Sequence, residues 1–193
     1  DSKQSRGLGD VYKRQVYLGI THRLDRPTSG VIIFTKTSKA LIRLNELFKK
    51  NEIKKTYWAI VKSINKKGPE KLENFLIKNQ KQNKSYVTEN SNKKGKKAIL
   101  YFKTIFELQK YSLLKIKLKT GRHHQIRTQL SNIGFPIKGD LKYGFPRSNN
   151  DGSIHLHSRK INFTHPVTKK NIEIIANPPK NNIWDLCLNC EEK

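Results

Sequence analysis

The chain has 193 residues and a formal net charge of +25, from 40 lysines and arginines against 15 acidic residues. No apolar run approaches the roughly 18 residues of a membrane span, so no membrane-spanning segment is expected, and two cysteines make no disulfide framework. The length and the 35% hydrophobic fraction fit one domain, and the lack of a disulfide framework fits a reducing cytoplasm. The positive charge favours nucleic acid as the partner, with an anionic membrane surface second.

The first residues differ in character from the rest. Residues 1–15 (DSKQSRGLGDVYKRQ) show no clear apolar period and no helix cap, and residues 9–15 resemble the translation of a transposon-end adaptor. We therefore expect residues 1–15 to be a non-native, adaptor-like segment that replaces upstream strands. Residues 16–179 are expected to form one folded domain, and residues 180–193 a C-terminal tail.

Three elements are predicted next. Residues 31–34 (VIIF) follow a charged turn and read as a buried strand. Ser38 can cap a helix that runs to about residue 51, because apolar residues recur there at helical spacing. Residues 56–62 (TYWAIVK) are rich in aromatic and β-branched residues, which favours a strand. The helical stripe consists of Leu41, Leu44, Leu47 and Phe48, and the strand places Tyr57, Ala59 and Val61 on one face and Trp58 and Ile60 on the other.

The middle of the chain predicts a loop, a hairpin and a helix. Residues 78–97 are polar and read as a long loop. Residues 98–108 and 112–119 predict a hairpin whose second strand alternates apolar residues with lysines, so that one face is apolar and the other basic. A turn at residues 120–121 leads into a helix that buries Ile126, Leu130 and Ile133, with Gly134 at its C′ position.

The last elements complete the fold class. Residues 155–163 and 171–176 read as two strands, and Pro178-Pro179 is expected to end the regular structure. Strands come first, then a helix, then more strands, without a steady βαβα alternation. This order favours an α+β fold with a mixed, mostly antiparallel central sheet flanked by helices.

One carboxylate in the charged turn could carry chemistry. In residues 21–30 (THRLDRPTSG), Asp25 lies between two arginines in a loop. Neighbouring cations favour the ionised form of a carboxyl group, and an ionised carboxylate beside a strand end can act as a nucleophile or a base. The alternative is a structural aspartate that ties down the turn or pairs with an arginine, and spacing alone favours this alternative.

This turn and three further motifs, in the same order, resemble the RluA-type pseudouridine synthase family, which modifies ribosomal and transfer RNA. The resemblance runs from about residue 16 to residue 179, which implies that these residues form a pseudouridine synthase catalytic domain without its N-terminal strands. The further motifs are residues 55–61 (KTYWAIV), residues 118–127 (LKTGRHHQIR) and a C-terminal set at residues 137–140 (IKGD), 143–144 (YG), 156–159 (LHSR) and 163–168 (FTHPVT).

The resemblance implies a role for four residues. Asp25 would be the catalytic aspartate, and Arg127 would pair with it and fix it. Tyr57 would stack on the target base and is a candidate for the proton transfer at C5. Arg23 would fill the space that the flipped uridine leaves. The reaction breaks the N1–C1′ bond and rejoins the base through C5, and the sequence leaves open whether Asp25 attacks the sugar or removes a proton from it. The resemblance implies no metal or redox cofactor.

Basic and polar residues near these motifs are the predicted RNA contacts. For Arg122, Lys138, Lys142 and Arg159, each taken alone, a solvated surface role is an equal alternative. For His124 and Gln125 the role could also be to position the loop. The predicted contacts are Arg23, Arg26, Arg122, His124, Gln125, Lys138, Lys142 and Arg159.

Metal binding is the weaker hypothesis for the histidines and cysteines. His123, His124, His155 and His157 lack a cysteine or carboxylate cluster beside them, and the Cys-x-x-Cys pair at residues 187–190 has no second pair to complete a zinc site. No metal is therefore expected.

Two other functions compete with the enzyme. One is a non-catalytic RNA-binding module on the same fold, which the loss of Asp25, Tyr57 or Arg127 would have favoured. The other is a basic ribosome-associated structural protein. Independently of these functions, many of the lysines could form only a solvated face. The intact Asp25 motif favours the enzyme, expected to be a cytoplasmic monomer with RNA as its partner.

Overall fold

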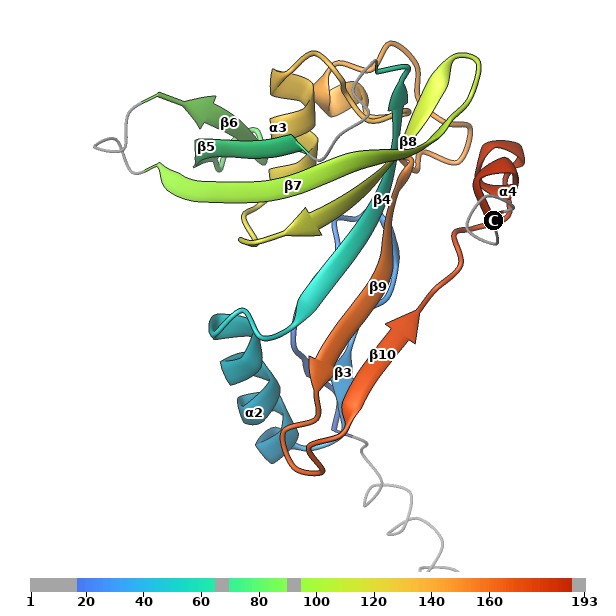
Figure 1. Ribbon diagram of the computed structural model, residues 1–193. Helices are drawn as coiled ribbons and strands as arrows, with labels where there is room; N and C mark the ends of the chain where they lie inside the picture. The colour runs from blue at the N-terminus through green and yellow to red at the C-terminus, as the bar shows by residue number, and fades with distance from the viewer. Residues whose placement is uncertain (1–16, 65–69, 90–94, 189–193) are drawn as a thin grey trace, which may run out of the picture.

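The computed structural model describes residues 17–64, 70–89 and 95–188, so residues 1–15, which were predicted to be an adaptor-like segment, lie outside the described residues. One curved sheet dominates the fold (Figure 1). Its strands lie in the order β10-β9-β4-β8-β7-β5-β6, and all of these neighbours are antiparallel. A short strand, β2 (Ser29–Gly30), adds the single parallel pairing of the described sheet, to β9. The predicted α+β class with a mostly antiparallel sheet is confirmed.

The strand bounds fit the predicted pattern closely after residue 95. The sheet consists of β10 (Asn171–Ile175), β9 (Leu156–Thr164), β4 (Lys54–Lys62), β8 (Tyr111–Leu118), β7 (Lys96–Glu107), β5 (Glu70–Asn79) and β6 (Lys84–Thr88).

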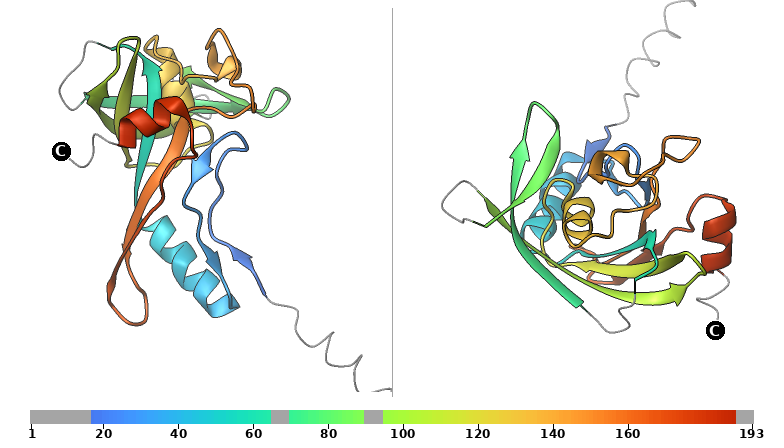
Figure 2. Two further views of the ribbon diagram at one scale, coloured as in Figure 1. Left: turned by 90° about the vertical axis from the view of Figure 1, so that its right-hand side faces the viewer. Right: turned by 90° about the horizontal axis from the view of Figure 1, so that it is seen from above.

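The main core lies on one face of the sheet, under helix α3 (Gln125–Asn132). Seen from above, α3 lies inside the curve of the strands (Figure 2). Tyr57, Ala59 and Val61 of β4 point to this face, as their alternation predicted, and Leu114 and Ile116 of β8 join them. Gly134 follows the end of α3 with a φ of 85°, the left-handed conformation that suits a C′ glycine.

The reverse face carries a second cluster that the sequence prediction missed. Trp58 and Ile60 of β4 are fully buried there against Trp184 and Cys187 of helix α4 (Asn182–Leu188). The expectation that Pro178-Pro179 ends the regular structure is therefore wrong. The helix forms because the Asn181 side chain accepts a hydrogen bond from its first turn, and because Trp58 would otherwise expose a large apolar surface.

A third cluster lies under α2 (Ser38–Lys49), whose predicted stripe contains its only buried residue, Leu44. The cap is Thr37 rather than Ser38, since its hydroxyl accepts a hydrogen bond from the Ala40 amide at 3.2 Å. The predicted strand at residues 31–34 is also wrong. Only β3 (Phe34–Thr35) forms, paired with β1 (Gly19–Ile20), and Phe34 is exposed because this short ribbon is covered on one side alone.

The predicted polar loop at residues 78–97 is instead largely a hairpin, in which β5 turns into β6, and residues 90–94 of it lie outside the described residues. Polar strands are tolerated there because the hairpin forms the edge of the sheet and is solvated on one side. Asn83 takes a left-handed φ of 45° in the turn. Ser85 is buried, and its amide donates to the Tyr143 hydroxyl at 2.9 Å, a tertiary contact that composition does not reveal.

Candidate active site

A cavity of about 850 Å³ opens between the Asp25 loop, β4 and the N-terminal end of α3. All three predicted catalytic residues, Asp25, Tyr57 and Arg127, line it. Five predicted RNA contacts also line it: Arg23, Arg26, Arg122, His124 and Gln125. Segments that are about 100 residues apart in the sequence are therefore brought to one place.

The Asp25 loop is held at both ends. At its start, the Thr21 hydroxyl donates to the Ile33 carbonyl at 2.6 Å, and the His22 ring accepts from the Ile33 amide at 3.1 Å. At its end, Gly30 has a φ of 120° and lies so close to β9 that a Cβ atom there would be 2.4 Å from the Ser158 carbonyl oxygen. Only glycine fits such an approach, so Gly30 fixes where the loop leaves the sheet.

Arg127 is fixed by a residue that the sequence prediction did not assign. Its Nε and Nη2 atoms donate to the two carboxylate oxygens of Asp140 at 2.7 and 2.8 Å, a bidentate pair. Side-chain exposure is 5% for Arg127 and 1% for Asp140, so both charges are buried together. Burial disfavours the charged guanidinium, but the hydrogen bonds to Asp140 and Asp25 and their negative charges together outweigh it, so the pKa of Arg127 is raised.

The third nitrogen of this guanidinium faces the cavity. Arg127 Nη1 lies 3.3 Å from Asp25 Oδ2, so the predicted contact between the two residues is present. The Asp25 side chain is 28% exposed, which leaves its carboxylate accessible from the cavity. Asp140 thus holds Arg127, and Arg127 in turn orients Asp25 toward the space that a substrate would occupy.

The nearest histidine is a neutral neighbour of Asp25. His124 Nε2 lies 3.7 Å from Asp25 Oδ2, close enough for an ion pair if the ring were charged. Burial, however, lowers the pKa of His124 to about 4, despite the opposing effect of Asp25. His124 has a left-handed φ of 51° before α3, and its Nδ1 bonds the Tyr143 hydroxyl at 2.9 Å. These contacts support the alternative in which His124 positions the loop.

Tyr57 presents a buried ring to the same cavity. It is 8% exposed, and burial raises the pKa of its hydroxyl to about 12, with the Asp25 charge adding to the effect. The phenol is therefore neutral at pH 7. A neutral, immobilised ring is suited to stacking on a base, and it is a poor proton acceptor.

Gln125 braces the loop that leads into α3. Its side-chain oxygen accepts from the Arg122 amide and the Thr120 hydroxyl, both at 2.9 Å, and its side-chain nitrogen donates to the Ile99 carbonyl at 3.1 Å. Next to it, His123 stacks on His124 with ring centroids 3.8 Å apart. These contacts support the positioning alternative for Gln125 rather than direct RNA contact.

Three predicted RNA contacts do not line the cavity. The Lys138 ammonium donates to Asn149 at 2.9 Å, and that of Lys142 donates to the carbonyls of the β5–β6 turn at 3.3 Å. Arg159 is buried, donates to the Ala176 carbonyl at 2.7 Å and lies over the Trp58 ring at 4.5 Å. RNA contact by these residues stays a prediction, and the position of Arg159 gives it no support.

The four histidines of the metal hypothesis lie in two separate places. His123 and His124 border the cavity, whereas His155 and His157 pack against Trp184, with centroids 5.3 and 6.1 Å away. Among the described residues, no group of three or more histidine, cysteine, aspartate or glutamate side chains could hold a metal ion. Cys190 lies outside the described residues.

Asp140 and Tyr143 are the functional-site residues that sequence reasoning missed. Tyr143 lies against the Arg127 guanidinium, 4.9 Å from the ring centroid, while its hydroxyl bonds His124. Both residues lie in motifs that carried the family resemblance. Asp140 also had a signal of its own, because an aspartate is uncommon in so basic a chain and buried carboxylates need a partner.

Buried histidines make the stability of the fold depend on pH. Burial lowers the pKa values of His22, His124 and His155 to about 4, from an ordinary value of 6.5. Below pH 6.5 the unfolded chain takes up protons that the folded chain does not, so stability should fall as the pH drops from about 6.5 toward 4. Urea unfolding at pH 7.5 and pH 5 should show a lower midpoint at pH 5, and equal midpoints would contradict these buried, neutral rings.

With this geometry in view, comparison with known proteins defines the class. The sequence model of the RNA pseudouridylate synthase family matches residues 5–132, and the chain belongs to this family. Solved structures share its fold: the human RNA pseudouridylate synthase domain containing 1 aligns with a TM-score of 0.71 at 20% identity, over 89% of this chain and 73% of that one.

Three relatives of known name show how similar the sequence is to particular pseudouridine synthases. The chain is 38% identical to the ribosomal large subunit pseudouridine synthase C of Buchnera aphidicola subsp. Baizongia pistaciae, over 83% of this chain and 53% of that protein. It is 38% identical to the ribosomal large subunit pseudouridine synthase D of Borreliella burgdorferi, over 74% and 44%. It is 32% identical to the tRNA pseudouridine synthase C of Haemophilus ducreyi, over 80% and 70%. The chain spans about half the length of the first two relatives.

Within residues 17–64, 70–89 and 95–188, no helix combines the length and apolar character that a membrane crossing requires.

Proposed function

We propose that this chain isomerises specific uridines to pseudouridine in ribosomal or transfer RNA. The observation that carries the proposal is an accessible Asp25 carboxylate, oriented by an Arg127 that Asp140 holds, beside the buried ring of Tyr57. Family membership and the names of the relatives, which include both ribosomal and transfer RNA enzymes, support the same reaction.

In this proposal Asp25 starts the reaction at the ribose. It either attacks C1′ or removes a proton from the sugar, so that the N1–C1′ bond breaks. The free base turns, and C5 bonds to C1′. In the first route the bond between Asp25 and C1′ breaks in this step, and in the second route Asp25 returns the proton to the sugar. C5 then loses its proton and N1 gains one, so the atoms balance without a co-reactant. Arg127 supplies a positive charge 3.3 Å from the Asp25 carboxylate and holds it in position for this step.

The target uridine has to leave its stack first, at a cost of a few kcal/mol. Tyr57 offsets part of this cost as a stacking platform for the flipped base, and Arg23 can fill the vacated space. Because its phenol is neutral, Tyr57 is better suited to stacking than to accepting the C5 proton. Arg26 and Arg122, which also line the cavity, supply positive charge for the phosphates around the target.

The setting of the protein follows from the same proposal. A substrate of ribosomal or transfer RNA supports a cytoplasmic location and RNA as the principal partner. We propose that the reaction needs no metal or redox cofactor, because it is a balanced isomerisation that carboxylate and cationic side chains can carry out. We also propose a monomer, since no step of the reaction calls for a second copy of the chain.

The test is the appearance of pseudouridine itself. Ribosomal and transfer RNA from cells that lack the gene should be mapped for pseudouridine before and after incubation with the purified protein. We expect modification at one or a few defined positions. Tight RNA binding without any new pseudouridine would instead favour the non-catalytic RNA-binding module.

A further inference from the structure

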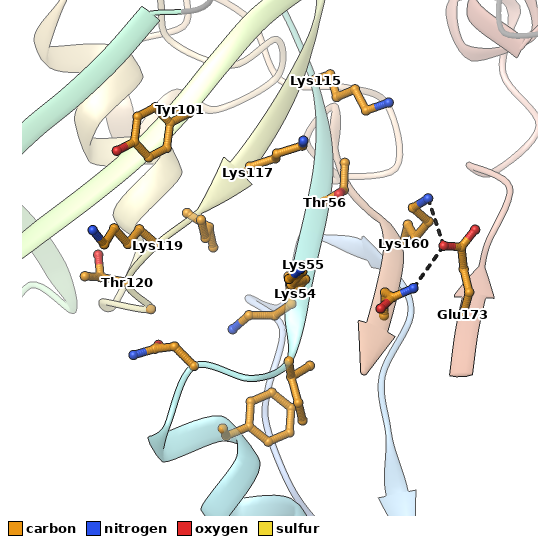
Figure 3. Close-up of a pocket in the computed structure, with 16 residues that line it drawn as sticks. Lys54, Lys55, Thr56, Tyr101, Lys115, Lys117, Lys119, Thr120, Lys160 and Glu173 are labelled. Carbon is orange, nitrogen blue, oxygen red and sulfur yellow. Dashed lines mark hydrogen bonds and ion pairs between the residues drawn. The ribbon is translucent and has the colours of Figure 1, made fainter. Parts of the chain in front are cut away.

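The reverse face of the sheet holds a second cavity, which the proposed reaction does not use. Its volume is about 640 Å³, and it lies across β7, β8, β4 and β9 (Figure 3). We call it the reverse-face groove. Helix α4 covers only the other part of this face, around Trp58. The lysines that line the groove are Lys54, Lys55, Lys115, Lys117, Lys119 and Lys160.

The pairing of the strands explains why these side chains meet. Tyr101 of β7 is opposite Lys117 of β8, Lys117 is opposite Thr56 of β4, and Thr56 is opposite Lys160 of β9. Directly opposite residues point to the same face, and neighbouring strands are about 4.8 Å apart. The four residues therefore form a row across the sheet. Lys115, two residues earlier in β8, and Lys119, just after the end of β8, lie on either side of that row.

The charges in the groove are poorly balanced within the protein. Glu173 is the one carboxylate among its lining residues, and it already pairs with Lys160 at 3.1 Å. Lys115 is also directly opposite Lys103 of β7, and like charges at such positions destabilise a sheet. An external polyanion would relieve this repulsion, so the groove is better suited to a phosphate backbone than to solvent alone.

The groove is continuous with the Asp25 cavity. Both are lined by Phe48, Asn51, Lys55, Leu118, Thr120 and Gly121. A chain that leaves the Asp25 cavity at this shared border would meet Lys55 and then the lysines of β8. Burial lowers the pKa of Lys55, and the described residues give it no carboxylate partner, so an incoming phosphate would be its first counter-charge.

From this geometry we infer that the reverse-face groove is a second RNA-binding surface, which holds a single-stranded segment next to the target uridine. This inference rests on the proposed function for the location of the target. The lysines bind the phosphates of that segment, and Tyr101, which is 40% exposed, is a platform on which a base can stack. A positively charged groove with an aromatic side chain is the usual arrangement for binding single strands without strong sequence preference.

The first experiment removes three lysines from β8 and the residue that follows it. The variant Lys115→Gln, Lys117→Gln, Lys119→Gln leaves the lining of the Asp25 cavity intact, since none of the three lines it. The matched control is Lys36→Gln, Lys39→Gln, Lys110→Gln, which removes the same charge from exposed positions outside both cavities. Fluorescence anisotropy would measure the binding of a labelled 20-nucleotide oligouridylate by both variants and the unmodified protein, from about 0.05 to 0.5 M salt.

The groove variant should bind at least about tenfold more weakly at 0.1 M salt, and its slope of log affinity against log salt should be shallower by about 2, from three phosphates at about 0.7 each. The control should change the slope by less than about 0.5. Equal losses in the two variants would overturn the groove as a site, because only net charge would then matter. Preferential loss of binding to phosphatidylserine vesicles, with RNA binding retained, would also overturn it.

A second pair of variants tests the stacking platform separately from charge. Tyr101→Leu should weaken oligouridylate binding about fivefold or more, because the stacking of one base is lost, whereas Tyr101→Phe should bind like the unmodified protein. Equal binding by the two variants would remove Tyr101 from the site.

The readout in both experiments is binding, so the result does not depend on turnover. If no pseudouridine forms but the groove variant still loses affinity, the proposed reaction fails and the groove stands. If pseudouridine forms and the groove variant binds like its control, the groove fails and the reaction stands.

Discussion

Replacing Asp25 with asparagine should reduce isomerisation by on the order of 10³-fold or more, while RNA affinity changes by less than about twofold. The amide has nearly the shape of the carboxylate, but it is a poor nucleophile and a poor base. RNA affinity should persist because lysines and arginines supply the phosphate contacts, and the loss of one anion from a chain of net charge +25 can only favour a polyanion. Tritium release from C5-labelled RNA would measure turnover, and filter binding would measure affinity.

The matched control is Glu46→Gln, which removes the same charge from an exposed position on α2. It should change neither turnover nor affinity. Isomerisation by the Asp25→Asn variant at close to the unmodified rate would refute the catalytic assignment of Asp25. Equal loss of binding and turnover would instead make Asp25 a residue that folds or docks the loop.

Local periodicity was sufficient to predict the strands that form the centre of the sheet. In β8, apolar residues and lysines alternate, and the structure places Leu114 and Ile116 in the main core and Lys115 and Lys117 in the reverse-face groove. The period of two fixes the face of each side chain once the strand is formed, whatever its partners are. The same rule predicted the two faces of β4.

Elements whose formation depends on distant partners could not be predicted in this way. Helix α4 is short, and it is stabilised by packing against Trp58, about 125 residues earlier in the chain. The β5–β6 hairpin is polar enough to read as a loop, and its contact with Tyr143 joins it to the rest of the fold. In both cases the local pattern is weak and tertiary contacts decide the structure.

The same limit applies to the candidate site, where single residues were predicted from motifs but a contact between distant side chains was not. Asp25, Tyr57 and Arg127 were predicted from motifs, and the cavity brings them together. The bidentate pair of Arg127 with Asp140 was not predicted, because the spacing of 13 residues along the chain says nothing of how the intervening turn folds back. The contacts that lead from Asp140 through Arg127 to Asp25 are therefore visible only in the structure.

The ion pair of Arg127 and Asp140 can be tested by substitution. Asp140→Ala should lower the free energy of unfolding by roughly 3–5 kcal/mol, because it leaves the Arg127 guanidinium buried without its main partner. Turnover should fall as well, since an Arg127 that is free to move no longer orients Asp25. Urea unfolding would measure the stability, and the tritium-release assay would measure the turnover.

Removing both charges separates the two effects. In the double variant Arg127→Met, Asp140→Leu, neither charge is left buried alone, and apolar side chains of similar size can replace a buried ion pair at little cost in stability. The double variant should therefore be more stable than Asp140→Ala or Arg127→Ala, and the coupling between the sites should exceed about 1 kcal/mol. Turnover should nevertheless stay as low as in Arg127→Ala, because Asp25 still lacks the guanidinium that lies 3.3 Å away in the unmodified protein. A double variant that recovers turnover along with stability would show that the pair only supports the fold. One that recovers stability alone would establish that the buried pair serves to orient Asp25.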